Sequence, residues 1–249
     1  MGKTTFLEKL QQKHPECHAY REGDYCPVEL AWCSYMTEDE YKEAIHQYPS
    51  LQSEIENWTT REDDTYIVAY TRIITDVPGF HKYMEQFEIY NGRRPKEEFE
   101  AIILNRYQNL PSAQNGIFEC AFFQNIVEEL ILFQEQTDEE ICSFYKKLFP
   151  IASRTDFTLY YLYGENIEEK ITRIRAERSD GQGNPVWYPL MMEYLKQSPY
   201  GQKHHIEDFD GMIAHFRHRQ QLELRIIKEI LGSHAQVLPA WPERETIDS

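Results

Sequence analysis

The chain alternates short apolar runs with longer segments of helical periodicity, and this alternation limits the choice of fold more than any other feature. Gly116–Phe123 and Asp156–Leu162 are apolar runs typical of buried strands, and His234–Leu238 is a weaker example. Cys17–Glu22 is a short strand-like run that ends at a glycine turn. Short buried strands separated by helices predict an α/β fold with a mostly parallel sheet.

Helical patterns fill most of the remaining sequence. Thr37 with Glu40 has the spacing of a capping box, and Pro49 and Pro95 are each expected to open a helix. Tyr66–Ile74 suits either a strand or a helix, and we expect a helix. The other predicted helices are Thr4–Lys13, Lys96–Asn109, Asp138–Leu148, Glu165–Arg178, Val186–Lys196 and Asp208–Leu231.

The composition describes a globular protein. The 249 residues can bury the core of one domain, and no repeat or linker divides them. Lys and Arg total 26 against 42 Asp and Glu, a formal net charge of -16 that argues against nucleic acid as the main partner. No apolar run approaches the roughly 20 residues that cross a bilayer, and no signal peptide follows Met1. We therefore expect a cytoplasmic protein with no membrane partner.

The cysteines give no sign of a disulfide framework or a zinc site. The chain has five cysteines, an odd number that cannot all pair in disulfides, and they include no C-x-x-C pair. We expect reduced thiols and no transition metal.

Gly2-Lys3-Thr4-Thr5 stands directly before an amphipathic helix and matches the second half of the phosphate-binding loop G-x-x-x-x-G-K-[ST]. In such a loop the glycine lets the backbone approach phosphate, and the helix N-terminus supplies N–H groups. Lys3 would reach the outer phosphates and the Thr4 hydroxyl would bind Mg²⁺. The tetrapeptide is short enough to occur by chance, and the strand that should precede it is absent from the sequence. The match to the phosphate-binding loop indicates ATP and Mg²⁺ as ligands.

Three further runs occur in order along the chain: Arg21–Trp32, Ile117–Asn125 and Ile174–Arg178. Together with the loop, they resemble a group of bacterial P-loop proteins described as ATP-binding or kinase-like, which are distantly similar to deoxynucleoside and thymidylate kinases. The resemblance covers nearly the whole chain.

The resemblance implies a three-layer, P-loop kinase-type parallel sheet in the order 2-3-1-4-5, within a single domain over residues 1–249. It also implies a helical insertion on the substrate side at about 37–110 and a lid at about 165–185. The first strand is missing from this sequence, so we expect Met1 to be an internal start, ATP binding to be weak, and strands 3 and 4 not to pair. Strands 2 to 5 would be Cys17–Glu22, Gly116–Phe122, Phe157–Leu162 and Gln236–Leu238.

The same resemblance implies an acid at the end of strand 2 that acts as a general base or holds the substrate hydroxyl. Glu22 and Asp24 are equal candidates for this role. Asp24 has an alternative role in stabilising the turn after Gly23. Trp32 would line the acceptor pocket, or it is a core residue.

Glu119 lies within an apolar run, where an unpaired carboxylate is costly, so it should have a partner. The resemblance places it near Mg²⁺ or Lys3; the alternative is a structural arginine. Cys120 follows it, where the kinase pattern has arginine, and this departure counts against a deoxynucleoside acceptor.

A lid is implied by basic residues at the end of the predicted helix Glu165–Arg178. Arg175 and Arg178 would neutralise charge on the phosphates during transfer. Arg173 can instead pair with Glu169 one helical turn away.

The sequence thus predicts an ATP- and Mg²⁺-dependent phosphotransferase, a kinase or ATPase, whose acceptor is a small molecule that bears a hydroxyl or phosphate group. A nucleoside- or nucleotide-like molecule is one candidate for this acceptor. Two alternatives remain open: a nucleotide-binding regulatory protein without catalytic activity, and an inactive truncated fragment.

Overall fold

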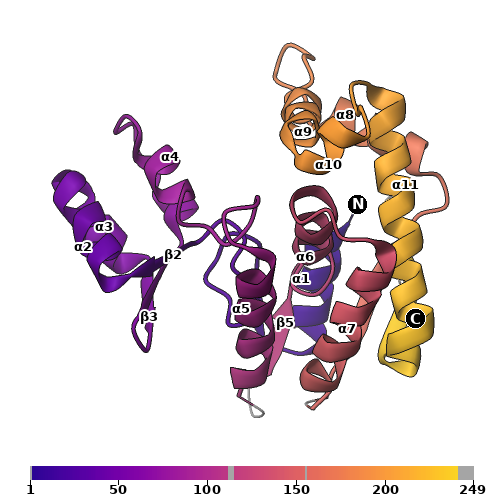
Figure 1. Cartoon of the computed structure of the whole chain (residues 1–249), viewed down its shortest axis with the longest axis horizontal. Helices are drawn as coiled ribbons and strands as arrows, with labels where there is room; N and C mark the ends of the chain where they lie inside the picture. Colours follow the sequence, from indigo (N-terminus) through magenta and orange to yellow (C-terminus); the bar gives the residue numbers. More distant parts are fainter. Residues whose placement is uncertain (1, 112–114, 155, 241–249) are drawn as a thin grey trace. The chain divides into compact units, whose positions relative to one another are not determined.

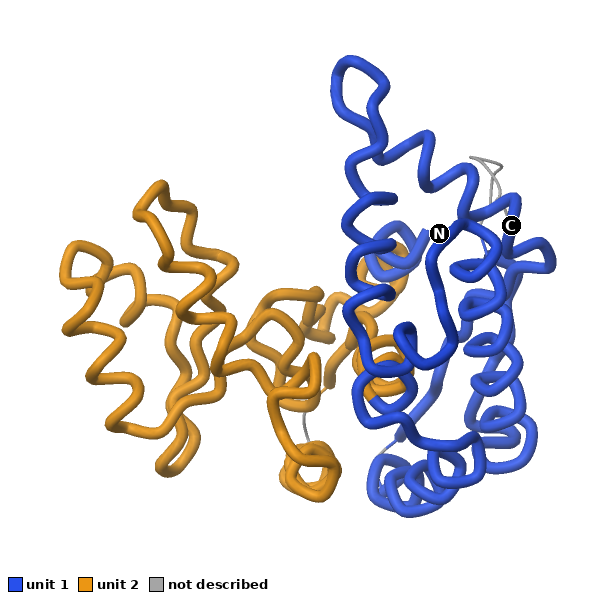
Figure 2. Tube along the Cα trace, turned by 45° about the horizontal axis from the view of Figure 1, so that its top comes forward, with its two compact units in different colours: residues 1–8, 130–249 blue, residues 9–129 orange. Residues whose placement is uncertain are grey.

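The computed structural model describes residues 2–111, 115–154 and 156–240; Met1, the expected internal start, lies outside these ranges. The chain is divided into two compact units (Figure 2). Unit 1 contains residues 1–8 and 130–249, and unit 2 contains residues 9–129. The single domain with an insertion and a lid stays a prediction.

A parallel strand pair forms one part of unit 2. Strand β1 (His18–Tyr20) pairs with β5 (Gly116–Phe118), with Ala19 opposite Ile117. The rings of Tyr20 and Phe118 stack with centroids 5.0 Å apart. Helix α5 (Lys96–Asn109) lies beside this pair in Figure 1, and the Tyr107 hydroxyl donates a hydrogen bond to the Ala121 carbonyl. The predicted end of α5 is confirmed.

The strand at residue 116 is shorter than expected. It ends at Phe118, and the next residues turn into helix α6 (Gln124–Glu128) rather than continuing the strand to Phe123. Cys120 has a backbone φ of 65°, a left-handed conformation that no extended strand contains. The local backbone therefore stops the strand although the apolar run continues.

An antiparallel sheet of order β2-β4-β3 forms the second part of unit 2. Its strands are β2 (Ser34–Thr37), β3 (Thr59–Glu62) and β4 (Thr65–Val68). The prediction of a helix over Tyr66–Ile74 is therefore wrong for Tyr66–Val68, and only a short 3-10 turn follows at Tyr70–Arg72. Ile67 and Val68 are β-branched and fully buried in the central strand, and these side chains suit a sheet that two neighbouring strands complete.

Short helices pack on this sheet and form a core with it. Helix α2 (Glu38–Gln47) begins with the predicted capping box, in which the Thr37 hydroxyl and the Glu40 carboxylate each accept a backbone hydrogen bond. A 3-10 turn that opens at Pro49 leads into α3 (Gln52–Asn57), and α4 (Phe80–Glu85) follows the sheet. The buried core consists of Met36, Tyr41, Ala44, Tyr48, Leu51, Ile55, Val68, Tyr70, Ile73, Phe80 and Met84.

Unit 1 contains a second parallel strand pair, together with helices. Strand β6 (Leu159–Tyr163) pairs with β7 (Ala235–Pro239), and the Tyr161 hydroxyl donates to Glu223 at 2.6 Å. Glu223 lies on α11, which packs against α7, α8 and α9. The helices are α7 (Asp138–Ala152), α8 (Ile167–Glu177), α9 (Trp187–Gln197), α10 (Pro199–Lys203) and α11 (Phe209–Ile226), which continues as a π-helical turn to Leu231.

The α/β class is confirmed, with small parallel sheets between helices. Among the described residues, β5 pairs with β1 and β6 pairs with β7, and no pairing joins β5 to β6. In the described residues each parallel sheet has two strands and the antiparallel sheet has three, so the five-strand order 2-3-1-4-5 stays a prediction. No helix in the described part of the chain is long and apolar enough to span a membrane.

Candidate functional site

Glu22 is the centre of a polar cluster in unit 2, two residues beyond the end of β1. One carboxylate oxygen accepts hydrogen bonds from the Gln124 amide at 3.1 Å and from the Trp32 indole N–H at 3.4 Å. The other faces the Cys120 thiol at 3.7 Å. Cys120 is in turn two residues beyond the end of β5. The cluster therefore lies at the carboxyl edge of the parallel pair, where α/β proteins commonly bind ligands.

Two of the residues that contact Glu22 have strained backbones. Trp32 and Cys120 both have a φ of 65°, a region that residues other than glycine seldom occupy and that costs about 1–3 kcal/mol each. Gly23, the residue after Glu22, has a φ of 87° and adopts this conformation without a penalty. The Trp32 side chain is 49% exposed beside the carboxylate. Strained backbone conformations concentrate at ligand sites, and here both strained residues contact Glu22.

Asp24, the other candidate acid, is engaged elsewhere. Its carboxylate forms an ion pair with Arg72 at 2.5 Å, and its backbone N–H closes a turn on the Arg21 carbonyl at 3.0 Å. The backbone hydrogen bond places Asp24 in the turn at Gly23, and the ion pair directs its carboxylate to Arg72. The geometry favours Glu22 as the acid that faces a ligand.

Glu29 is a buried acid close to this cluster that the sequence analysis did not identify. Its side chain is 4% exposed, and Oε1 accepts from the Leu30 and Ala31 backbone N–H groups at 2.8 Å and from the Tyr90 hydroxyl at 2.6 Å. Oε2 is buried and has no hydrogen-bond partner among the described residues. Burial raises the pKa of Glu29 to about 7, and the negative charge of Glu22 adds to the shift. An acid inside the apolar run from Val28 to Ala31 was the signal that could have identified it.

The structure changes the interpretation of Glu119. Because β5 ends at Phe118, Glu119 is half-buried in a turn rather than enclosed in a strand, and its N–H donates to the Tyr20 carbonyl at 3.0 Å. Among the described residues, no group of three or more His, Cys, Asp or Glu side chains could hold a metal ion. The metal-binding roles of Glu119 and Thr4 stay predictions.

The predicted phosphate-binding residues lie at the start of α1 (Lys3–Lys13). Gly2 has a φ of 86°, which glycine adopts readily, and its carbonyl accepts the Phe6 N–H at 2.8 Å. Lys3, Thr4 and Thr5 are exposed in the first helical turn, which contains no acid. This end of the helix suits an anion, because its N–H groups and dipole attract negative charge and the first turn contributes no acidic side chain of its own. These residues belong to unit 1 and Glu22 belongs to unit 2.

The predicted lid residues are exposed at the end of α8. The Arg175 guanidinium lies over the Tyr188 ring, 4.4 Å from its centroid. The Arg178 carbonyl accepts backbone hydrogen bonds from Val186 and Trp187, which closes the loop between α8 and α9. Arg173 pairs with Glu169 at 3.6 Å, as the alternative interpretation expected.

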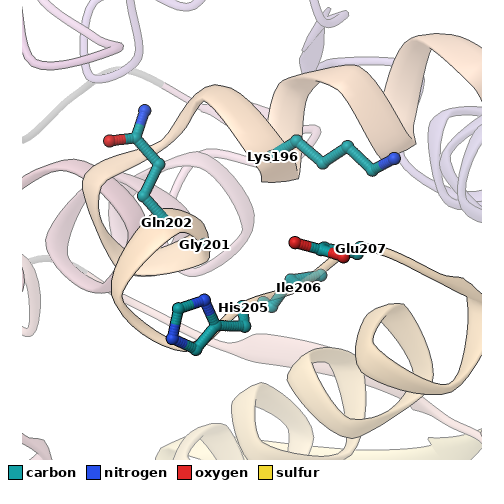
Figure 3. Close-up of a pocket in the computed structure, with 6 residues that line it drawn as sticks. All are labelled: Lys196, Gly201, Gln202, His205, Ile206 and Glu207. Atoms are coloured by element: carbon teal, nitrogen blue, oxygen red, sulfur yellow. The ribbon is translucent and has the colours of Figure 1, made fainter.

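A separate pocket of about 350 Å³ lies in unit 1 where α9 and α10 meet the start of α11 (Figure 3). It contains none of the predicted site residues. The lining residues are Lys196, Gly201, Gln202, His205, Ile206 and Glu207, of which only Gly201 and Ile206 are buried.

Comparison of the chain with protein-family models, curated proteins and solved structures finds no match. The resemblance to P-loop kinases therefore stays a prediction.

Proposed function

We propose that this chain is a P-loop, kinase-like phosphotransferase that uses Mg-ATP and acts on a small acceptor with a hydroxyl or phosphate group. The observation that carries the proposal is the position of Glu22. A half-buried carboxylate at the carboxyl edge of β1 and β5, flanked by strained residues and an exposed indole, suits the orientation of an acceptor hydroxyl.

The strand pairs support the same fold. In the order 2-3-1-4-5, strands 2 and 3 are parallel neighbours, and so are strands 4 and 5. The pairs β1–β5 and β6–β7 have this orientation and this place in the sequence.

Each residue in the proposed site has a defined part. Gly2, Lys3, Thr4 and Thr5 bind the phosphates through backbone N–H groups and the Lys3 ammonium. Mg²⁺ usually keeps several waters and binds substrate phosphates, so few protein ligands are needed. Thr4 and Glu119 are the candidates for that role. When bound, Mg-ATP would supply the phosphoryl group, and its Mg²⁺ would neutralise the negative charge on the phosphates. Glu22 accepts the hydroxyl proton of the acceptor, and Arg175 and Arg178 close over the phosphates.

Replacing Lys3 with alanine tests the nucleotide site. We expect weak Mg-ATP binding by the chain and at least a tenfold further loss in Lys3→Ala, because a charge-assisted hydrogen bond is typically worth about 1.5–3 kcal/mol. Lys13→Ala is the matched control, since it removes an exposed lysine from the other end of the same helix. Isothermal titration calorimetry measures both affinities, and circular dichroism verifies the fold.

Equal affinities of wild type and Lys3→Ala, or no binding of Mg-ATP, would overturn the nucleotide site. Binding without turnover across a panel of hydroxyl and phosphate acceptors would instead favour a nucleotide-responsive regulatory protein.

A further inference from the structure

The segment from Glu29 to Cys33 is a tight turn built around a buried carboxyl group. Glu29 Oε1 accepts the backbone N–H groups of Leu30 and Ala31, and the Cys33 N–H donates to the Leu30 carbonyl at 3.0 Å. The turn holds Trp32 at a φ of 65° with its indole N–H directed to Glu22. Glu29 is thus connected to Glu22 through Leu30, Ala31 and Trp32, which follow it in the chain.

We propose that Glu29 is a positioning residue for the acceptor site: its buried carboxyl group holds the turn that presents Trp32 to Glu22, and ligand binding at Glu22 depends on whether this carboxyl group is ionised. The identity of the ligand rests on the proposed function. The coupling of Glu29 to Trp32 is independent of that function.

Ionisation of Glu29 changes both the turn and the acid at its end. The hydrogen bonds to an ionised oxygen are roughly twice as strong as those to a neutral one, so the turn becomes firmer. The added negative charge also lies close enough to Glu22 for the two carboxylates to repel each other. The pKa of Glu29, about 7, places this change near neutrality.

The titratable groups that interact with Glu29 come from several elements. The Tyr90 hydroxyl donates directly to its carboxylate, and the charge of Glu22 opposes its ionisation. Tyr107 on α5 and the thiols of Cys26 and Cys33 also interact with its charge, and burial raises the pKa of each of these three groups well above neutrality. Glu29 is therefore the group in this set whose charge changes near neutrality.

The experiment follows the indole N–H of Trp32 by NMR in the full chain labelled with ¹⁵N-tryptophan, with Trp32→Phe used to assign the signal. In wild type we expect this signal to titrate with a midpoint near pH 7. In Glu29→Gln the midpoint near 7 is lost. Glu88→Gln is the matched control, because Glu88 is equally buried with a pKa of about 7 but bonds to Tyr70 rather than to the turn.

Tyr90→Phe provides a second test if Glu29→Gln does not fold. Removal of one hydrogen bond to the carboxylate should move the Trp32 midpoint upward by about 0.5–1 pH unit. A Trp32 signal that does not titrate near 7 in wild type, or that titrates unchanged in Glu29→Gln, would overturn the inference.

Turnover provides the readout that separates the two proposals. Acceptor-dependent ATP consumption should rise through pH 7 in wild type and lose this inflection in Glu29→Gln, with Glu88→Gln unchanged. A titrating Trp32 signal without any turnover would sink the proposed function and leave Glu29 as the residue that positions Trp32.

Discussion

Glu22→Gln is expected to lower acceptor-dependent ATP consumption by about a hundredfold or more while leaving Mg-ATP affinity unchanged. A general base typically contributes 10²–10⁴ to the rate, and glutamine keeps the shape of the side chain but cannot take a proton. The Gln124 and Trp32 donors still have an amide oxygen to bind, so the cluster should stay in place. Steady-state turnover and calorimetric ATP binding on the same preparations measure the two effects.

Asp24→Asn is the control for this substitution. Asp24 pairs with Arg72 through a side chain that is one-third exposed, so its loss should lower stability by less than about 1 kcal/mol and change turnover little. A large loss of turnover in Asp24→Asn with a fully active Glu22→Gln would reverse the assignment of the two acids.

The free energy of unfolding is expected to fall as the pH rises from about 4.5 to 7, because two acids are buried with raised pKa values. Burial raises the pKa of both Glu29 and Glu88 from an ordinary 4.5 to about 7. Within that interval the native state binds protons that the unfolded state has released, so stability present below pH 4.5 is lost progressively and then levels off above pH 7. Each acid contributes on the order of 3 kcal/mol at most.

Urea denaturation at pH 5 and at pH 7.5 measures this loss. Other carboxylates also titrate, so the informative quantity is the difference between wild type and either Glu29→Gln or Glu88→Gln. Relative to wild type, each variant should gain stability as the pH rises. A difference that stays constant with pH would mean that these acids are not buried as described.

The features predicted well from the sequence are those that local contacts decide. The capping box at Thr37 depends on residues three positions apart, and α5 follows from Pro95 and its apolar periodicity. Tyr66–Ile74 was predicted wrongly because its neighbours, β2 and β3, come from elsewhere in the chain and override local preference. The early end of β5 depends on the single conformation of Cys120, which composition does not reveal.

In the candidate site, too, only the residues that follow a local sequence pattern could be predicted. Glu22 was identifiable because an acid at the end of a strand is a local pattern. Its partner Gln124 is 102 positions away, and the Tyr90 hydroxyl that binds Glu29 is 61 positions from it. Only the folded backbone brings such residues together. Asp24 could not be separated from Glu22 until its ion pair with Arg72 was seen.

The placement of the cysteines makes one side of the site accessible to thiol chemistry. Cys26, Cys33 and Cys142 are buried, and burial raises the pKa of each, to about 12 for Cys26, so their reactive thiolates are scarce. Cys17 and Cys120 are half-exposed. A single change, Cys17→Ser, would therefore leave Cys120 as the main target of an alkylating reagent. Because its sulfur lies 3.7 Å from Glu22, its rate of alkylation reports directly whether a candidate acceptor occupies the site.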